Sequence, residues 1–451
     1  MTEAVGDLGY AFVDVRPNIR RNKEDRTIDI TFDIQEGPRV YVERINISGN
    51  TRTLDKVIRR EFRLAEGDAF STAKLKRSQQ RLKNLGFFSK VDVTPQPGST
   101  SDKTALDVQV TEQSTGEISF GAGYSTTGGI LGDISIAERN LLGKGQNLRL
   151  GLSLGTLSTL INLSFTEPYF LDRAVAAGFD VFRTSNDRQN IASYSDSSIG
   201  FALRAGWSYT EHTSQQVRYT LKDSNIYNVQ YFASPLIQSQ AGEFVTSEIS
   251  ETIAWDTRDT RLNTTKGQLL RNTIAIAGAP GTENYIRTSL DGVIYQKLVD
   301  DFIVSVGGSV GFTQSYTGNP LRLTERFFVG GDNLRGFAAG GIGPRDLNTG
   351  DALGGKYFYT GTAEASFPLG LPKELGITGK AFVDVGSLWG AETNYSYNVN
   401  VVDDPSMRIG AGFGVQWVSP FGPIRVDYAW PVQQQYFDKT QNLRFGFGTR
   451  F

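Results

Sequence analysis

Cysteine is absent from the sequence, and histidine occurs once, as His212, in 451 residues. Disulfide scaffolds, Cys/His zinc sites and catalytic arrangements that need a thiolate or a second imidazole are therefore excluded. Two acidic pairs, Asp256 with Asp259 and Asp403 with Asp404, lack the spacing of a calcium loop. Basic and acidic residues nearly cancel, at 46 against 48, which argues against nucleic acid as a partner. We expect a protein that is not an enzyme and has no metal or cofactor.

Long apolar runs are also missing. No stretch approaches the ~18 to 20 consecutive apolar residues of a transmembrane helix, and the mean hydropathy is −0.28. The N-terminal residues lack the basic and apolar regions of a signal peptide. Glycine is abundant, with 50 residues, and aromatic residues make up 11% of the chain. This combination of many glycines and aromatics with low mean hydropathy is typical of a membrane β-barrel.

The N-terminal part contains a repeat. The segment from Gly9 to Val15 (GYAFVDV) has a similar copy between Gly86 and Val93 (GFFSKVDV). The spacing between the two copies, from Gly9 to Gly86, is that of a small domain used in series. We interpret residues 1–36 as the C-terminal part of one copy and residues 37–113 as a complete copy. We therefore expect the sequence to be a truncated piece that begins within a repeat.

The complete copy has a readable order of elements. An alternating strand near 40–47 precedes two helices, for which Thr53 and Ser71 are predicted N-caps, and Gly86 is placed to end the second helix. Strands near 88–95 and 103–111 follow. The pattern predicts an α+β domain of the order β-α-α-β-β.

Residues 114–451 read as strands of alternating apolar and polar or glycine positions, separated by turns. Many strands reach the ~9 to 11 residues that cross a bilayer at a tilt. A long connection, residues 315–354, interrupts the series, and connections of this length are usually functional. The pattern predicts a transmembrane antiparallel β-barrel of sixteen strands, near 117–125, 129–138, 145–154, 159–166, 174–184, 197–209, 213–222, 246–256, 267–278, 284–297, 301–314, 355–368, 376–386, 407–418, 422–430 and 441–450.

The long connection carries a recognisable motif. Its segment from Arg326 to Phe337 (RFFVGGDNLRGF) resembles the signature loop of the Omp85 superfamily, which folds back into the barrel. The domain at 37–113 resembles a POTRA module, and EPYF at 167–170 and FVDVG at 382–386 add further matches. The resemblance covers nearly the whole chain. It is strongest to the branch of the superfamily that assembles outer-membrane barrels, whose members carry several POTRA modules.

The resemblance implies a latch for the loop. Glu364 lies on the more polar face of its strand, and Val383 and Val385 face lipid, which turns Asp384 inward. In the family the loop arginine pairs with acids at these two places. Arg335, followed by Gly336 and Phe337, is therefore expected to form charge-assisted hydrogen bonds to both acids. The alternative is that the two acids only line a wet lumen.

The two ends of the barrel sequence suggest a second site. The last strand places Phe445, Phe447 and the terminal Phe451 on one face, which resembles the signal by which outer-membrane barrels are recognised for assembly. This strand must pair with the first strand, and both are rich in glycine, which weakens a strand. We expect a weak lateral seam at four glycines; alternatively, glycine only offsets bulky neighbours there. The seam glycines are Gly121, Gly123, Gly446 and Gly448.

The resemblance implies a non-enzymatic factor in the outer membrane of a Gram-negative-type cell, with POTRA domains in the periplasm. Its partners would be unfolded outer-membrane client proteins, lipoproteins of the assembly complex and the lipid bilayer. An open seam exposes main-chain groups that seek a partner strand in lipid, so clients would be inserted there. The alternatives are a secretion pore for a dedicated substrate and a passive porin, and a porin would have neither the POTRA module nor the Arg335 loop.

Overall fold

The structure is a computed structural model that describes residues 13–22, 27–36, 40–261, 263–299, 301–392, 399–419 and 422–448. The chain divides into two compact units, one of residues 1–117 with 137–148 and one of residues 118–136 with 149–451. Within the described ranges, no helix is long and apolar enough to cross a membrane.

The first unit contains a three-stranded sheet with two helices packed against it. Its strands follow the order β3-β5-β4, in which β5 pairs in parallel with β3 and antiparallel with β4. The predicted β-α-α-β-β order is confirmed. Two further strands, β1 (Val13–Asn22) and β2 (Thr27–Glu36), form a separate antiparallel pair. The elements of the domain are β3 (Tyr41–Ser48), α2 (Asp55–Arg59), α3 (Thr72–Asn84), β4 (Phe88–Pro97) and β5 (Lys103–Glu112).

One of the two predicted helix caps is confirmed. The Ser71 side chain accepts a hydrogen bond from the main-chain N–H of Lys74 at 3.2 Å and begins α3. The prediction for Thr53 is wrong, because α2 begins at Asp55 with Leu54 as its N-cap. The main-chain N–H of Thr53 instead donates to the Glu112 carboxylate at 2.6 Å. That acceptor comes from β5, so local sequence spacing could not reveal it.

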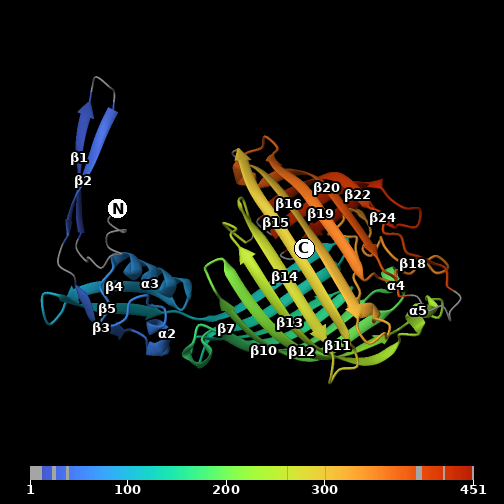
Figure 1. The fold of residues 1–451 in the computed structure, drawn as a ribbon, viewed down its shortest axis with the longest axis horizontal. Helices are drawn as coiled ribbons and strands as arrows, with labels where there is room; N and C mark the ends of the chain where they lie inside the picture. The colour runs from blue at the N-terminus through green and yellow to red at the C-terminus, as the bar shows by residue number, and fades with distance from the viewer. Residues whose placement is uncertain are drawn as a thin grey trace. The chain divides into compact units, whose positions relative to one another are not determined.

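The second part of the chain forms a closed barrel of sixteen strands, as predicted. Figure 1 shows the strands from β10 to β16 running side by side. Strands β12 and β13 extend beyond their predicted ends at one side, because residues such as Ile226 and Phe244 are buried beneath loops there. The strands are β6 (Gly116–Ser125), β7 (Gly129–Leu141), β8 (Gln146–Gly155), β9 (Ser158–Glu167), β10 (Ala176–Asp187), β11 (Ser195–Ser208), β12 (Thr213–Tyr227), β13 (Gly242–Asp256), β14 (Gly267–Ala277), β15 (Tyr285–Val299), β16 (Phe302–Ser315), β19 (Tyr357–Pro368), β20 (Ile377–Trp389), β22 (Arg408–Ser419), β23 (Gly422–Gln433) and β25 (Leu443–Phe447).

Successive side chains along each barrel strand point alternately to the lipid-facing surface and to the lumen. On β20 the side chain of Val383 is exposed, whereas the neighbouring Phe382 and Asp384 are buried. On β11, Phe201 and Leu203 are exposed and Ala202 is buried. An outward row of apolar side chains of this kind is what a strand presents to a bilayer.

The connection between β16 and β19 packs against the inner faces of the strands. It contains the short helix η2 (Leu323–Glu325) and two-residue strands β17 (Gly336–Phe337) and β18 (Arg345–Asp346). β17 pairs with β24 (Thr440–Gln441), and β18 pairs with β21 (Val401–Val402). Other loops carry η1 (Phe170–Asp172), α4 (Gln189–Ala192), α5 (Pro235–Gln238) and η3 (Lys373–Leu375).

Candidate functional site

The tip of the inward loop places Arg335 against β20. Its side chain is only 3% exposed. Nε and the main-chain N–H both donate to Asp384 Oδ2, at 2.7 and 2.9 Å, and Nη2 donates to Asp384 Oδ1 at 2.8 Å. Nη1 donates to Glu364 Oε2 on β19 at 2.6 Å. The planar guanidinium is thus bound in a fork to one carboxylate and by its remaining arm to a second.

The charges around Arg335 balance. Lys380, on the lumen face of β20, lies 3.0 Å from Glu364 Oε1, so two cations meet two carboxylates. The guanidinium carbon also lies 3.3 Å from the centroid of the Phe382 ring. Burial lowers the pKa of Arg335, but its bonds to Asp384 and the charges of both acids outweigh burial and raise that pKa. Arg335 therefore stays charged, and each buried charge has a partner.

The two residues after Arg335 fix the position of the tip. Phe337 is fully buried in an apolar cluster with Leu334, Ile342 and Leu388. Gly336 has a φ of +94°, which favours glycine, and a Cβ at this position would lie 3.2 Å from the main chain of Trp430. The structure thus brings all five predicted latch residues together.

The environment of the tip includes residues that have no counterpart in the sequence prediction, among them Lys380 and Gly410. Lys380 could have been predicted, because it lies four residues before Asp384 on β20 and therefore faces the lumen as well. Gly410 on β22 could not. A Cβ at Gly410 would lie 2.0 Å from the Arg335 carbonyl oxygen, so the main chains of loop and strand are in close contact there.

The root of the loop is held by a second buried group of charges. Glu325, which is 1% exposed, accepts from Lys222 Nζ on β12 at 2.9 Å and from Arg287 Nη2 on β15 at 2.7 Å. Burial raises the pKa of Glu325, but the two cations outweigh it and lower that pKa to about 2. The loop is therefore fixed by buried ion pairs at both its root and its tip.

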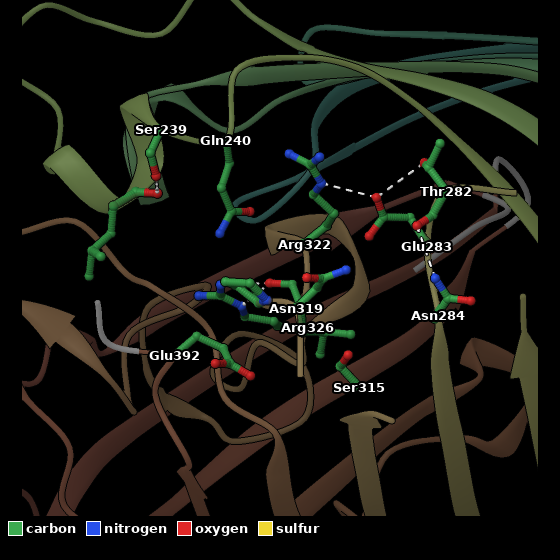
Figure 2. A pocket seen from close by; sticks show the side chains of 13 residues that line it. Ser239, Gln240, Thr282, Glu283, Asn284, Ser315, Asn319, Arg322, Arg326 and Glu392 are labelled. Carbon is green, nitrogen blue, oxygen red and sulfur yellow. Dashed lines mark hydrogen bonds and ion pairs between the residues drawn. The ribbon is translucent and has the colours of Figure 1, made fainter. Parts of the chain in front are cut away.

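A cavity of about 340 Å³ lies beside this root. Figure 2 shows Arg322 directed at Glu283, to which its Nε donates at 3.1 Å. Arg326 is bound to main-chain carbonyls instead: Nε and Nη2 donate to Leu321 and Nη1 donates to Leu353. The cavity wall is therefore part of the hydrogen-bonded support of the loop.

The last and first strands of the barrel, β25 and β6, meet at a seam. The ladder recorded between β25 and β6 consists of Gly446 with Ser125 and Phe447 with Tyr124. One more bond crosses it, from the Thr126 N–H to the Phe445 carbonyl at 3.0 Å. The two ladder pairs belong to the described part of β25, and the described residues end at Gly448.

The predicted seam glycines occupy different positions. Gly446 lies within the ladder, and Gly123 and Gly448 lie just beyond it. A Cβ at Gly123 would meet the Phe447 carbonyl oxygen at 2.7 Å, and one at Gly448 would meet the Ala122 carbonyl oxygen at 2.6 Å. These two glycines therefore allow the strands to approach closely. Gly121 has no recorded partner on β25 within the described residues.

The predicted C-terminal signal is described in part. Phe445 faces outward, with its ring centroid 6.0 Å from that of Tyr124 across the seam. Phe447 lies opposite Tyr124 in the ladder. Phe451 lies outside the described residues.

The acidic pairs serve turns. Asp256 forms an ion pair with Arg258, and Asp259 accepts hydrogen bonds from Thr265. Asp403 accepts from the main-chain N–H of Gly390. No group of three metal-ligating side chains occurs in the part of the chain that the structure describes.

A closed sixteen-stranded barrel, a β-α-α-β-β domain and an inward loop with a buried arginine together define a transmembrane barrel of the Omp85 type. The model of the Omp85 superfamily domain matches residues 140–451, and the POTRA model (surface antigen variable number repeat) matches residues 1–37 and 40–113. The chain belongs to the Omp85 superfamily. It is an outer-membrane barrel with periplasmic POTRA sequence.

Similar proteins carry the name outer membrane protein assembly factor BamA. That of Neorickettsia risticii (strain Illinois) is 31% identical over 456 residues, covering 100% of this chain and 60% of the relative. That of Neisseria meningitidis serogroup B is 29% identical and covers 99% and 61%. The chain thus spans about 60% of the length of these relatives.

Solved structures show the same fold. The crystal structure of BamA from Haemophilus ducreyi lacking POTRA domains 1–3 matches with a TM-score of 0.83 and 26% identity, covering 99% of this chain and 91% of that one. CdiB from Acinetobacter baumannii matches with a TM-score of 0.60 and 15% identity, covering 99% and 79%. The second likeness concerns the fold alone.

Proposed function

We propose that the chain is the membrane part of an outer-membrane protein assembly factor, which folds and inserts client β-barrels through the β6/β25 seam. It acts without enzymatic chemistry. Its partners are unfolded outer-membrane client proteins, outer-membrane lipoproteins of an assembly complex and the surrounding lipid. The similarity to BamA proteins supports this assignment, and the glycine-rich seam between the last and first strands is the observation that carries the mechanism.

The physical argument concerns unpaired main-chain groups. Strands β6 and β25 are the two ends of the barrel sequence, and glycines lie where they meet: Gly446 pairs with Ser125, and Gly123 and Gly448 come into close contact one position further on. Glycine weakens a strand, so this ladder should part more readily than its neighbours. Each main-chain group left unpaired in lipid costs several kcal/mol. The exposed edge of β6 therefore favours any strand that can pair with it, and an extended client segment satisfies that need by β-augmentation.

The latch has a supporting role in this proposal. Arg335, Glu364 and Asp384 hold the loop tip inside the lumen, so the barrel remains filled while its wall opens. A filled lumen separates an insertase from a pore. The aromatic outward face of β25, with Phe445 and Phe447, is proposed to serve assembly of this barrel itself.

A cross-link at the seam tests the proposal. The chain has no native cysteine, so Ser125→Cys with Gly446→Cys creates one pair across the seam at directly opposite positions. Ser309→Cys with Thr360→Cys is the matched control, because these residues face each other in the β16/β19 ladder. Each variant is reconstituted in liposomes, and folding of a denatured client barrel is followed with the pair reduced and oxidised.

Three outcomes separate the candidate functions. Client folding that stops on oxidation at the seam, but not at the control ladder, supports insertion at the seam. Client folding that is equally fast in all states removes the seam from the mechanism. High and steady ion conductance without client folding would favour the second candidate, a secretion pore for a dedicated substrate.

A further inference from the structure

One carboxylate of the inward loop touches both sides of the seam. Asp332 Oδ1 accepts from Arg444 Nη1 on β25 at 2.8 Å. Asp332 Oδ2 accepts from the Thr127 hydroxyl, in the turn after β6, at 3.1 Å. The same side chain therefore bridges the last strand and the first hairpin, at one end of the ladder between β25 and β6.

The position of Asp332 is set by the latch. Arg335 lies three residues further along the loop and is bound to Asp384. Between them, the Asn333 side chain accepts from the Gly330 N–H at 2.9 Å, which closes a tight turn. Arg444 is held to the same tip, because its Nη2 donates to the Phe337 carbonyl oxygen at 3.1 Å. The loop tip and the last strand thus form one connected group.

The strength of the bridge differs from that of the latch. The Asp332 side chain is 67% exposed, whereas Arg444 is 5% exposed. Exposed ion pairs are weak and are screened by salt, unlike buried ones. The bridge is therefore suited to open and close while the latch remains bound.

Arg444 also has an alternative acceptor. Asp427 on β23 lies directly opposite Arg444 in the β23/β25 ladder. Asp427 Oδ1 and Arg444 Nε are both buried without a hydrogen-bond partner among the described residues. Asp427 Oδ2 is bound by Arg425 Nε, whereas Oδ1 is available to accept from Arg444 when Asp332 releases the guanidinium. Arg444 then keeps an acceptor and does not become an unpaired buried cation.

We propose that Asp332 is a positioning residue that clasps the seam closed and couples it to the inward loop. The role of the clasp in client insertion rests on the proposed function, but the clasp itself does not. Breaking it increases the population of barrels with a parted seam whether or not a client is present.

Spin labels across the seam measure this directly. Leu443→Cys on β25 and Ile130→Cys on β7 are exposed, outward-facing positions at the clasp end of the seam. Pulsed EPR on the labelled protein in liposomes gives the distance distribution between them. Asp332→Ala should raise the ratio of long to short distances about five-fold, the equivalent of roughly 1 kcal/mol. Thr127→Val, which keeps the side-chain shape, should raise it about two-fold.

Controls separate the clasp from general effects. Asp403→Ala removes an acid from another loop and should leave the distances unchanged. Raising the salt from about 0.05 M to 1 M should widen the seam in the parent protein but not in the Asp332→Ala variant. Distances that are identical in the parent, Asp332→Ala and Thr127→Val at both salt concentrations would overturn the clasp. Because no client is present, a missing insertase activity would overturn the proposed function without affecting this result.

Discussion

The latch leads to a quantitative prediction for barrel stability. Asp384 is 1% exposed and binds Arg335 through both carboxylate oxygens. Replacing Asp384 by Leu leaves a guanidinium that cannot give up its proton, with only Glu364 as counter-ion. Loss of one partner of a buried ion pair costs about 3 to 5 kcal/mol. The same reasoning applies to Arg335→Met, which leaves the Asp384 carboxylate buried without its cation.

The effects of the two substitutions on the free energy of unfolding should not be additive. In the double variant Arg335→Met/Asp384→Leu neither charge is left unpaired, and Glu364 keeps Lys380 as its partner. We therefore expect the double variant to be no less stable than either single variant, with a coupling free energy of about 3 kcal/mol. The parent, the two single variants and the double variant form a double-mutant cycle. Their unfolding by urea in phospholipid vesicles is followed by tryptophan fluorescence.

An exposed ion pair serves as the control. Lys373 in η3 pairs with Asp301, which lies between β15 and β16, and the two side chains are 77% and 42% exposed. Lys373→Ala should change the unfolding free energy by about 1 kcal/mol or less. A coupling free energy below about 0.5 kcal/mol between Arg335 and Asp384 would refute the argument that they act as one buried unit.

Three further predictions concern other parts of the chain. Because Glu325 has a lowered pKa, its stabilising effect is present above the usual value of 4.5 and is lost as the pH falls towards about 2; the unfolding midpoint of Glu325→Gln should fall below that of the parent at pH 7 and converge with it as the pH falls from about 4.5 to 2. Gly410→Ala should destabilise the barrel by about 1 to 3 kcal/mol, because its Cβ would meet the Arg335 carbonyl, whereas Gly132→Ala, with its nearest contact at 3.9 Å, should not. Ser71→Ala removes the cap of α3 and should cost about 1 kcal/mol, visible as faster hydrogen exchange confined to that helix.

The barrel strands were predictable because one local rule governs them. Alternation between lipid and lumen repeats every two residues, so Phe201 and Leu203 mark their strand without knowledge of its neighbours. The pairs β17 with β24 and β18 with β21 obey no such rule. Each is two residues long and joins segments far apart in sequence. Their pairing depends on where the closed barrel places the loop.

Two kinds of sequence information predicted part of the site: the alternation of side chains along each strand, and the family resemblance. The alternation predicted that the side chains of Glu364 and Asp384 point inward. Only the family resemblance predicted that they bind Arg335. The root contact of Glu325 with Lys222 and Arg287 involves three segments that come together only when the barrel closes. Asp332 was hidden for another reason. An exposed aspartate in a glycine-rich loop has the sequence appearance of an ordinary turn residue.

The contrast between these charges sets an order of events. The ion pairs at the root and tip of the loop are buried, so breaking either one costs several kcal/mol. The bridge from Asp332 to Arg444 and Thr127 depends on a carboxylate that is 67% exposed, although Arg444 itself is buried. The weakest connection is therefore the one across the seam. The seam should part first, with Arg335 still bound to Asp384 and the loop still in the lumen. Under the proposed function, this order of events brings a client strand to an open edge in a barrel that remains plugged, so that insertion into the membrane opens no leak through the pore.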